Sequence, residues 1–292
     1  MLPLLRELGH LKRIRSAGRR GSVASRLFRS AWADLVSGEP IEAVALATTA
    51  RALAAARLAD LDPALLARLG LSVEEAAGIQ RDGFDDVAGC VAQPLRSQLR
   101  AALASGAEAR GSPLPGFVEA LDEQPRAGIT CPGRPRIVLQ PPESHAEHCL
   151  AVAIYGVVLS PCYGADPGTV FLAALAHHLH NAAMPDGGFT GEMLLGPHLE
   201  RAIWNATEAA LGELSPHLRA VVEEARTILA DADSPEGRAF HAADVIDRVL
   251  EVEQHLVGAR LTMGDVLGEM ALVHDGPVKP FHDRVLREME LA

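Results

Sequence analysis

The 292-residue sequence is poor in aromatic residues, in paired cysteines and in long uncharged apolar runs. Aromatic side chains make up 4% of it, and the four cysteines (Cys90, Cys131, Cys149 and Cys162) have no spacing typical of metal ligands or of a disulfide framework. No uncharged apolar run approaches the roughly 18 residues that suggest a membrane span, and no apolar segment of the secretory type stands near the start. We therefore expect a soluble cytoplasmic protein without a transmembrane segment.

The sequence also lacks an internal repeat and a glycine-rich phosphate loop. The stretch "GRRGS" follows no predicted strand, so it does not match a nucleotide-binding fingerprint. The chain does contain 48% hydrophobic and 22% charged residues, which is enough for a sizeable core in one large domain or two smaller ones.

Positive charge is concentrated near the N-terminus, in a basic arm that no acidic residue interrupts between Gly9 and Ala33. The arm consists of Lys12, Arg13, Arg15, Arg19, Arg20, Arg26 and Arg29. Because the net charge of the whole chain is −11, the rest of the chain is strongly acidic, which argues against specific nucleic-acid binding. We interpret the arm as a solvated terminus that folds back on the acidic body. The alternatives are contact with phosphates or an anionic membrane, and a targeting peptide.

Apolar residues at helical spacing predict an all-α fold with helices in both parts of the chain. Residues 1–110 form an N-terminal helical region, which could serve as the interface of a homo-oligomer, as a lid over a site or as a partner-binding surface. Residues 111–142 are rich in proline and glycine and predict a connection, with a short edge strand at "RIVLQ". Residues 143–292 form a second helical domain. One of its helices is predicted to end near Pro161, and the next to begin with Asp166 as its cap and Pro167 at its first position.

The stretch "AALAHHLHN" places His177, His178 and His180 within four residues on a nonpolar helix. Imidazole is costly to bury without a partner, so each ring needs a hydrogen bond, a metal or water. On a helical wheel His177 and His180 share a face, while His178 lies one step around. Upstream, in "SHAEHCLAV", His145 and His148 stand three residues apart and also share a face.

Further along the chain, "FHAADVID" places Asp244 among alanines on a helix that must be mostly buried. An acidic residue in such a position is expected to be paired or to bind a cation. Asp247 lies one turn further on, and we interpret it as a solvated helix charge that replaces Asp244 only if the helix is rotated.

Together these stretches resemble the three signature helices of the HD-domain superfamily of metal-dependent phosphohydrolases. His148 in "EHCLAVA", the pair in "LAALAHHLHNA" and Asp244 in "AADVIDRVLE" follow the family order H…HD…D across residues 142–256. The resemblance implies an HD-like bundle in residues 143–292, with a metal held by His148, His177, His178 and Asp244. One position departs from the family pattern, because His178 stands where the family has aspartate. His178 either binds the ion directly or hydrogen-bonds beside it.

This ligand set suits one divalent transition metal, such as iron, manganese or zinc. Three neutral imidazoles and one carboxylate leave a divalent ion with a net charge of +1, and magnesium prefers oxygen ligands. Gly191 in "TGEMLLG" stands where many members of the family have a further histidine, so His198 and His217 are the nearby candidates for extra ligands. Four further histidines of the C-terminal part, His241, His255, His274 and His282, are interpreted as polar-edge residues of helices.

The loop "NAAMPDGGFTGE" follows the histidine helix and brings Asp186 and Glu192 close to the predicted ion. Either carboxylate is a candidate general base in place of the missing aspartate, and His180 is a candidate catalytic or substrate-contacting residue. These residues predict a metal-dependent hydrolase of a phosphoester or nucleotide-like small molecule. The alternatives are an iron-dependent oxygenase of the same superfamily, which would need His198 and His217 at the site, and a non-catalytic regulatory or assembly module.

Overall fold

The computed structural model of the chain describes residues 1–103, 113–256 and 262–291. Within these ranges the backbone is helical and forms no β-strand, which confirms the predicted all-α fold class. The helices of the N-terminal part are α1 (Leu2–Gly9), α2 (Val23–Val36), α3 (Ile41–Leu58), α4 (Pro63–Arg68), α5 (Val73–Val87) and α6 (Gln93–Ala102). The later helices are α7 (Gly116–Glu123), α8 (His145–Tyr163), α9 (Pro167–Ala176), α10 (Gly188–Leu195), α11 (Leu199–Leu211), α12 (Pro216–Ala225), α13 (Pro235–Leu256) and α14 (Lys279–Glu288).

The predicted connection contains more helix and less strand than its composition suggests. Residues 116–123 form α7, whose Phe117 and Leu121 are buried. The run "RIVLQ" forms a single antiparallel bridge between Ile129 and Ile137 instead of an edge strand. The predicted boundary at residue 110 lies outside the described residues.

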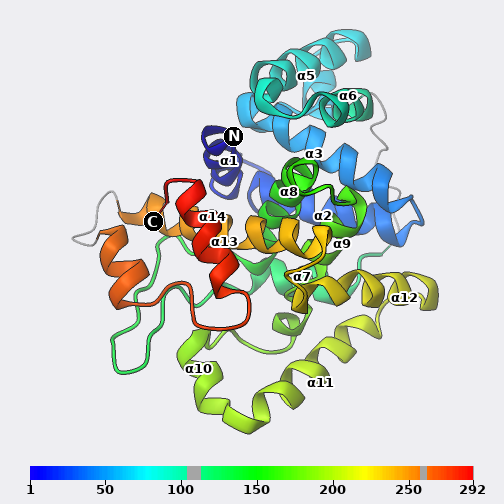
Figure 1. Cartoon of the computed structure of the whole chain (residues 1–292). Helices are drawn as coiled ribbons and strands as arrows, with labels where there is room; N and C mark the ends of the chain where they lie inside the picture. The colour runs from blue at the N-terminus through cyan, green and yellow to red at the C-terminus, as the bar shows by residue number, and fades with distance from the viewer. Residues whose placement is uncertain (104–112, 257–261, 292) are drawn as a thin grey trace.

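Helix α8 is the central element of the fold, and every one of its residues from 145 to 160 is buried. It packs against α9, α13 and α2, while the alanine-rich α3 packs against α8 and α9 (Figure 1). Gly156 permits the close approach of α9, because a Cβ atom at position 156 would lie only 2.5 Å from Val170 Cγ1. One continuous hydrophobic core therefore contains residues from both the N-terminal helices and the later ones.

One helix of the described chain, α8, has the length and hydropathy of a membrane span. Because 83% of that apolar window is buried inside the fold, its hydropathy is accounted for by its place in the core. The structure therefore gives no clear transmembrane segment.

The basic arm does fold back on the acidic part of the chain, as predicted, and each of its basic residues forms an ion pair with at least one carboxylate. Arg19 pairs with Asp60 and Asp62, and Arg20 with Glu119 and Glu123. Lys12 corrects the expectation of a solvated arm, because its side chain is only 2% exposed. The arm is thus partly an internal structural element.

Candidate metal centre

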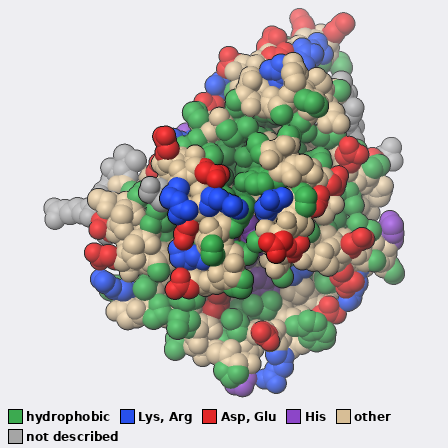
Figure 2. Space-filling view, viewed as in Figure 1, with side chains coloured by type: hydrophobic (Ala, Val, Ile, Leu, Met, Phe, Trp, Pro, Cys, Tyr) green, Lys and Arg blue, Asp and Glu red, His purple; other side chains and the backbone are tan. Residues whose placement is uncertain are grey.

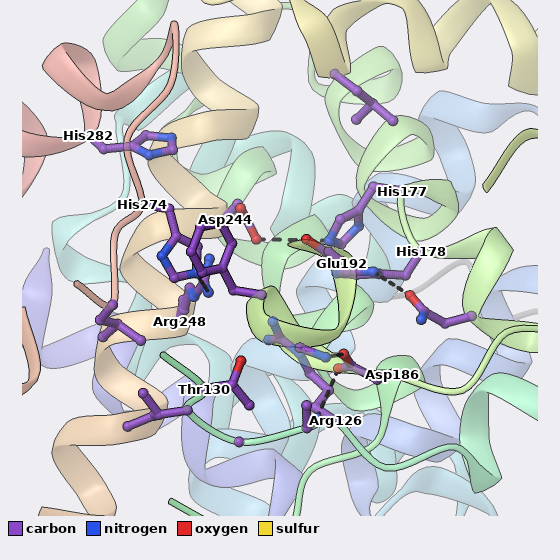
Figure 3. Close-up of a pocket in the computed structure, with 18 of the residues that line it drawn as sticks. Arg126, Thr130, His177, His178, Asp186, Glu192, Asp244, Arg248, His274 and His282 are labelled. Atoms are coloured by element: carbon purple, nitrogen blue, oxygen red, sulfur yellow. Dashed lines mark hydrogen bonds and ion pairs between the residues drawn. The ribbon is translucent and has the colours of Figure 1, made fainter. Parts of the chain in front are cut away.

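A polar pocket of about 360 Å³ lies where α9, α10, α13 and the segment before α14 meet. Figure 2 shows histidine at the floor of a hollow on this face, with basic side chains beside it. The titratable residues of the pocket wall are Arg126, His177, His178, His180, Asp186, Glu192, His241, Asp244, Arg248, His274 and His282 (Figure 3). Among the described residues, none that precedes Arg126 lines the pocket, so the N-terminal helices do not form its lid.

Three helices, α8, α9 and α13, carry three of the predicted metal ligands and bring them together. His148 lies in the first turns of α8, which begins with a capping box between Ser144 and Glu147. His177 caps the C-terminal end of α9, and Asp244 projects from the middle of α13. The start of α9 is as predicted, with Asp166 accepting a hydrogen bond from the Thr169 amide at 2.7 Å.

The structure corrects two predicted helix ends. Pro161 does not stop α8, which continues through Tyr163 and ends at Gly164 in the left-handed conformation. Helix α9 ends at Ala176, so the histidine cluster follows a helix instead of forming part of one. The carbonyl groups at this end accept hydrogen bonds from side chains: His177 Nδ1 donates to the Ala174 carbonyl at 2.6 Å, and Arg226 donates to the Ala176 carbonyl.

Hydrogen bonds hold one ring nitrogen of His148 and one of His177 and leave Nε2 of each ring as the candidate ligand atom. A carbonyl oxygen only accepts, so the His177 proton is on Nδ1 and its Nε2 lone pair is free. In the same way, His148 Nδ1 lies 2.7 Å from the Asp247 carboxylate and donates to it, which frees His148 Nε2. Burial and the neighbouring His148 lower the pKa of His177 to about 3, so this ring is neutral at physiological pH.

The freed lone pairs converge on one place. His148 Nε2 lies 3.1 Å from His177 Nε2 and 3.2 Å from Asp244 Oδ1, and the last atom lies 3.9 Å from His177 Nε2. Three acceptor atoms this close repel one another unless a proton or a metal cation stands among them. The residues present therefore fit a divalent ion, and the hydrogen bond of each outer nitrogen is the arrangement typical of metal-binding histidines.

His178 lies beside His148 and His177, although the helical wheel places it away from the face of His177. The nitrogen atoms of His148, His177 and His178 lie within 4.8 Å of one another, and the His177 and His178 rings are 4.2 Å apart. The helical wheel predicted that His177 and His180 share a face, but because α9 ends at Ala176 it is His178 that turns in beside His177. His178 Nδ1 is 2.8 Å from the Asn181 side-chain oxygen and donates to it, which leaves Nε2 as a possible ligand atom.

Asp247 is not the solvated charge that its position on the sequence suggests. Its side chain is 1% exposed, and its carboxylate lies 2.7 Å from Lys12 Nζ as well as 2.7 Å from His148 Nδ1. Burial alone would raise the pKa of this carboxyl group, but Lys12 and His148 outweigh burial and lower it. Asp247 thus supports the candidate ligand His148 by a hydrogen bond and does not take the position of Asp244.

The three predicted catalytic side chains all line the pocket. Both oxygens of Asp186 accept backbone amides, from Ala127 at 2.9 Å and from Gly188 at 2.8 Å, so this carboxylate is held in place. Burial, together with the charge of Asp186, raises the pKa of Glu192. Burial lowers the pKa of His180 to about 4, so His180 is neutral at physiological pH.

The structure also adds pocket residues that the sequence pattern did not identify. His241, His274 and His282, read from the sequence as polar-edge residues, line the wall, and each has a buried ring nitrogen without a hydrogen-bond partner among the described residues. Arg126 and Arg248 line the same wall. The sequence pointed to Arg248 in one way only: it lies four residues after Asp244, and residues four apart share a helix face. The candidates His198 and His217 are exposed and lie outside the pocket wall.

Comparison of the chain with protein-family models, with curated proteins and with solved structures found no match. The resemblance to HD-domain proteins therefore rests on the residues of this chain alone, and its consequences are taken up as a proposal below.

The buried histidines predict a pH-dependent stability for the metal-free protein. Burial and Arg126 lower the pKa of His145 to about 2, whereas the ordinary value in an unfolded chain is about 6.5. The folded state thus keeps His145 neutral, and the stability this provides is complete above pH 6.5 and is lost as the pH falls towards 2. We expect His145→Gln to reduce the slope of unfolding free energy between pH 6.5 and 5 by up to about 1.4 kcal/mol per pH unit.

Urea denaturation of metal-free protein at several pH values measures this slope. The exposed His217 provides the matched control, since His217→Gln removes an imidazole that is not buried. Equal slopes for wild type and His145→Gln would show that the neutral ring does not govern the pH dependence.

Proposed function

We propose that this chain is a divergent HD-domain metalloenzyme that hydrolyses a phosphoester or nucleotide-like small molecule. The observation that carries the proposal is the convergence of His148 Nε2, His177 Nε2 and Asp244 Oδ1 on one place at the edge of the pocket. The order of these residues along the chain is the order of the HD-domain signature, and the helices that carry them, α8, α9 and α13, pack against one another.

His148, His177, His178 and Asp244 would hold one divalent transition ion. Iron, manganese or zinc suits three imidazoles and one carboxylate. When bound, such an ion acts as a Lewis acid and lowers the pKa of water towards neutrality. The remaining steps fall to the side chains around it, which must orient the substrate, hold its charge and accept a proton.

Arg248 is the pocket residue best suited to hold an anionic group of the substrate. It forms no ion pair with a carboxylate among the described residues. Its Nη2 is hydrogen-bonded to an imidazole nitrogen, His274 Nε2, at 3.2 Å. Burial and the like charge of Arg126 lower the pKa of Arg248, which means that its guanidinium is incompletely compensated by the carboxylates around it. A phosphate group would satisfy this guanidinium with charge-assisted hydrogen bonds.

Glu192 is the better placed of the two candidate general bases. Its raised pKa brings it nearer to the neutral range in which proton transfer is efficient, whereas both oxygens of Asp186 already accept backbone hydrogen bonds. Asp186 would then hold the 186–188 turn, from which α10 carries Glu192 to the pocket.

The alternative of an iron-dependent oxygenase is favoured by the number of imidazoles at the site, but not by the exposed positions of His198 and His217. The alternative of a non-catalytic module predicts neither hydrolysis nor oxygen uptake. Both alternatives are therefore outcomes of the experiment that tests the proposal.

The first test measures metal content and phosphate release on the same preparations. Wild type reconstituted with Mn²⁺, Fe²⁺ or Zn²⁺ is expected to bind close to one equivalent and to release phosphate from p-nitrophenyl phosphate or from nucleotides. His177→Ala and Asp244→Ala should lose the metal and the activity together, while His217→Ala retains both. Metal with oxygen uptake but without phosphate release would support the oxygenase, and metal without either reaction would support the module.

Arg248→Gln tests the anionic subsite. Loss of a charge-assisted hydrogen bond costs about 1.5–3 kcal/mol, so we expect KM to rise about 10- to 100-fold with metal content unchanged. Arg201→Gln, a substitution of an exposed arginine outside the pocket, is the control. An unchanged KM in Arg248→Gln would remove Arg248 from substrate binding.

Glu192→Gln and Asp186→Asn separate the two carboxylates. Removal of a general base lowers kcat by about 10²- to 10⁴-fold, so we expect Glu192→Gln to show this loss with its metal retained. Asp186→Asn should cost less in kcat, because the amide oxygen still accepts backbone hydrogen bonds. The reverse order of the two effects would assign the base to Asp186.

A further inference from the structure

Lys12 is a buried lysine whose position is explained by the acidic groups around it. Its ammonium lies 2.7 Å from Glu143 Oε2, 2.7 Å from Asp247 Oδ1 and 3.4 Å from Glu251 Oε2. The side chains of these residues are at most 6% exposed, so water screens none of the contacts well. Lys12 does not line the pocket, so it cannot touch a substrate there.

Asp247 connects this lysine to the candidate metal centre. Lys12 Nζ approaches both oxygens of the carboxylate, at 2.7 Å and 2.8 Å, and Oδ2 also accepts from His148 Nδ1 at 2.7 Å. Both hydrogen bonds, from Lys12 and from His148, go to Oδ2, while Oδ1 is in ion-pair contact with the ammonium and accepts no hydrogen bond among the described residues. These contacts together restrict the rotation of the carboxylate. The lone pair offered to His148 therefore has a fixed direction, and with it the orientation of the imidazole.

The same carboxylates explain why this place is not itself a metal site. Glu143, His148 and Asp247 offer ligand atoms within 4.8 Å of one another, which is the spacing of a possible ion site. The Lys12 ammonium lies within hydrogen-bonding distance of both carboxylates, and so it serves as the cation of this group.

From this geometry we infer that Lys12 is a positioning residue of the metal centre: through Asp247 it holds His148 in the tautomer and orientation that present Nε2 to the ion. The inference rests on the metal centre proposed above but not on the reaction. It makes the N-terminal arm a part of the site, although Lys12 lies more than 130 residues before the first ligand.

The test compares the affinity of the full-length protein for Co²⁺, measured in competition with a chelator, and the visible spectrum of the Co²⁺ form. We expect Lys12→Met to weaken Co²⁺ binding about 10- to 100-fold, the usual effect of losing a group that supports a metal ligand, and to alter the spectrum. The direction of the change in Co²⁺ affinity distinguishes loss of position from loss of charge. Removing a positive charge near the ion would by itself strengthen cation binding, so a weaker affinity requires loss of position.

Arg6→Met is the matched control. Arg6 forms an ion pair with Glu253 at 2.7 Å, so it joins the same N-terminal segment to the same helix, α13, without contacting Asp247. Its Co²⁺ affinity should stay within about twofold of wild type. Lys12→Arg, which keeps the charge, should recover part of the affinity that Lys12→Met loses.

The inference is overturned if folded Lys12→Met binds Co²⁺ like wild type, or if Arg6→Met weakens binding equally.

If Lys12→Met does not fold, Lys12→Arg provides the test, because a guanidinium cannot reproduce the contacts of an ammonium. An altered Co²⁺ spectrum of Lys12→Arg supports the inference, and an unchanged one contradicts it. If wild type binds no Co²⁺, ¹⁵N NMR of the His148 ring decides, because the Nδ1-protonated tautomer should be lost in the Lys12 variants alone. Binding of Co²⁺ without hydrolysis would contradict the proposed reaction and leave this inference intact.

Discussion

The structure depends on the burial of one ionised carboxylate, that of Asp247. An isolated buried charge is so costly that the group must be paired and hydrogen-bonded. Lys12 and His148 meet this requirement, and they come from the two ends of a chain segment that spans almost half the sequence. This single side chain therefore ties the N-terminal arm, the central helix α8 and the helix α13 into one arrangement.

Around Asp247 the buried charges form a balanced group. Lys12 contacts three carboxylates, Arg126 contacts Glu143 at 3.0 Å, and Arg13 contacts Glu251 at 2.5 Å. The carboxylates and cations compensate one another, and the network has a defined geometry because Lys12 contacts three carboxylates at once. On the side of His177 and Asp244, this network presents the second nitrogen of His148.

Helix α13 separates this closed network from the open pocket. Asp244, Asp247 and Arg248 lie at positions i, i+3 and i+4, and so project from one side of the helix over little more than one turn. Asp247 is 1% exposed and Asp244 26% exposed, which places one carboxylate in the network and the other at the pocket wall. The same turn thus supplies a proposed ligand, the support of another ligand and a proposed anion contact.

The sequence by itself determined the helical fold, the capped start of α9, and the three stretches from which the candidate ligands come. These features are local: apolar periodicity, an Asp cap and a histidine in a nonpolar segment can each be recognised from a few neighbouring residues. Only the tertiary structure decided where α9 ends, and hence how His178, which the family resemblance already placed beside His177, comes to lie there although the helical wheel pairs His177 with His180. It also decided that Asp247 and Lys12 are buried together, and that His241, His274 and Arg248 face the pocket. The physical reason is that burial and pairing of a charge depend on partners far along the chain, and no local pattern records which distant residue will supply them.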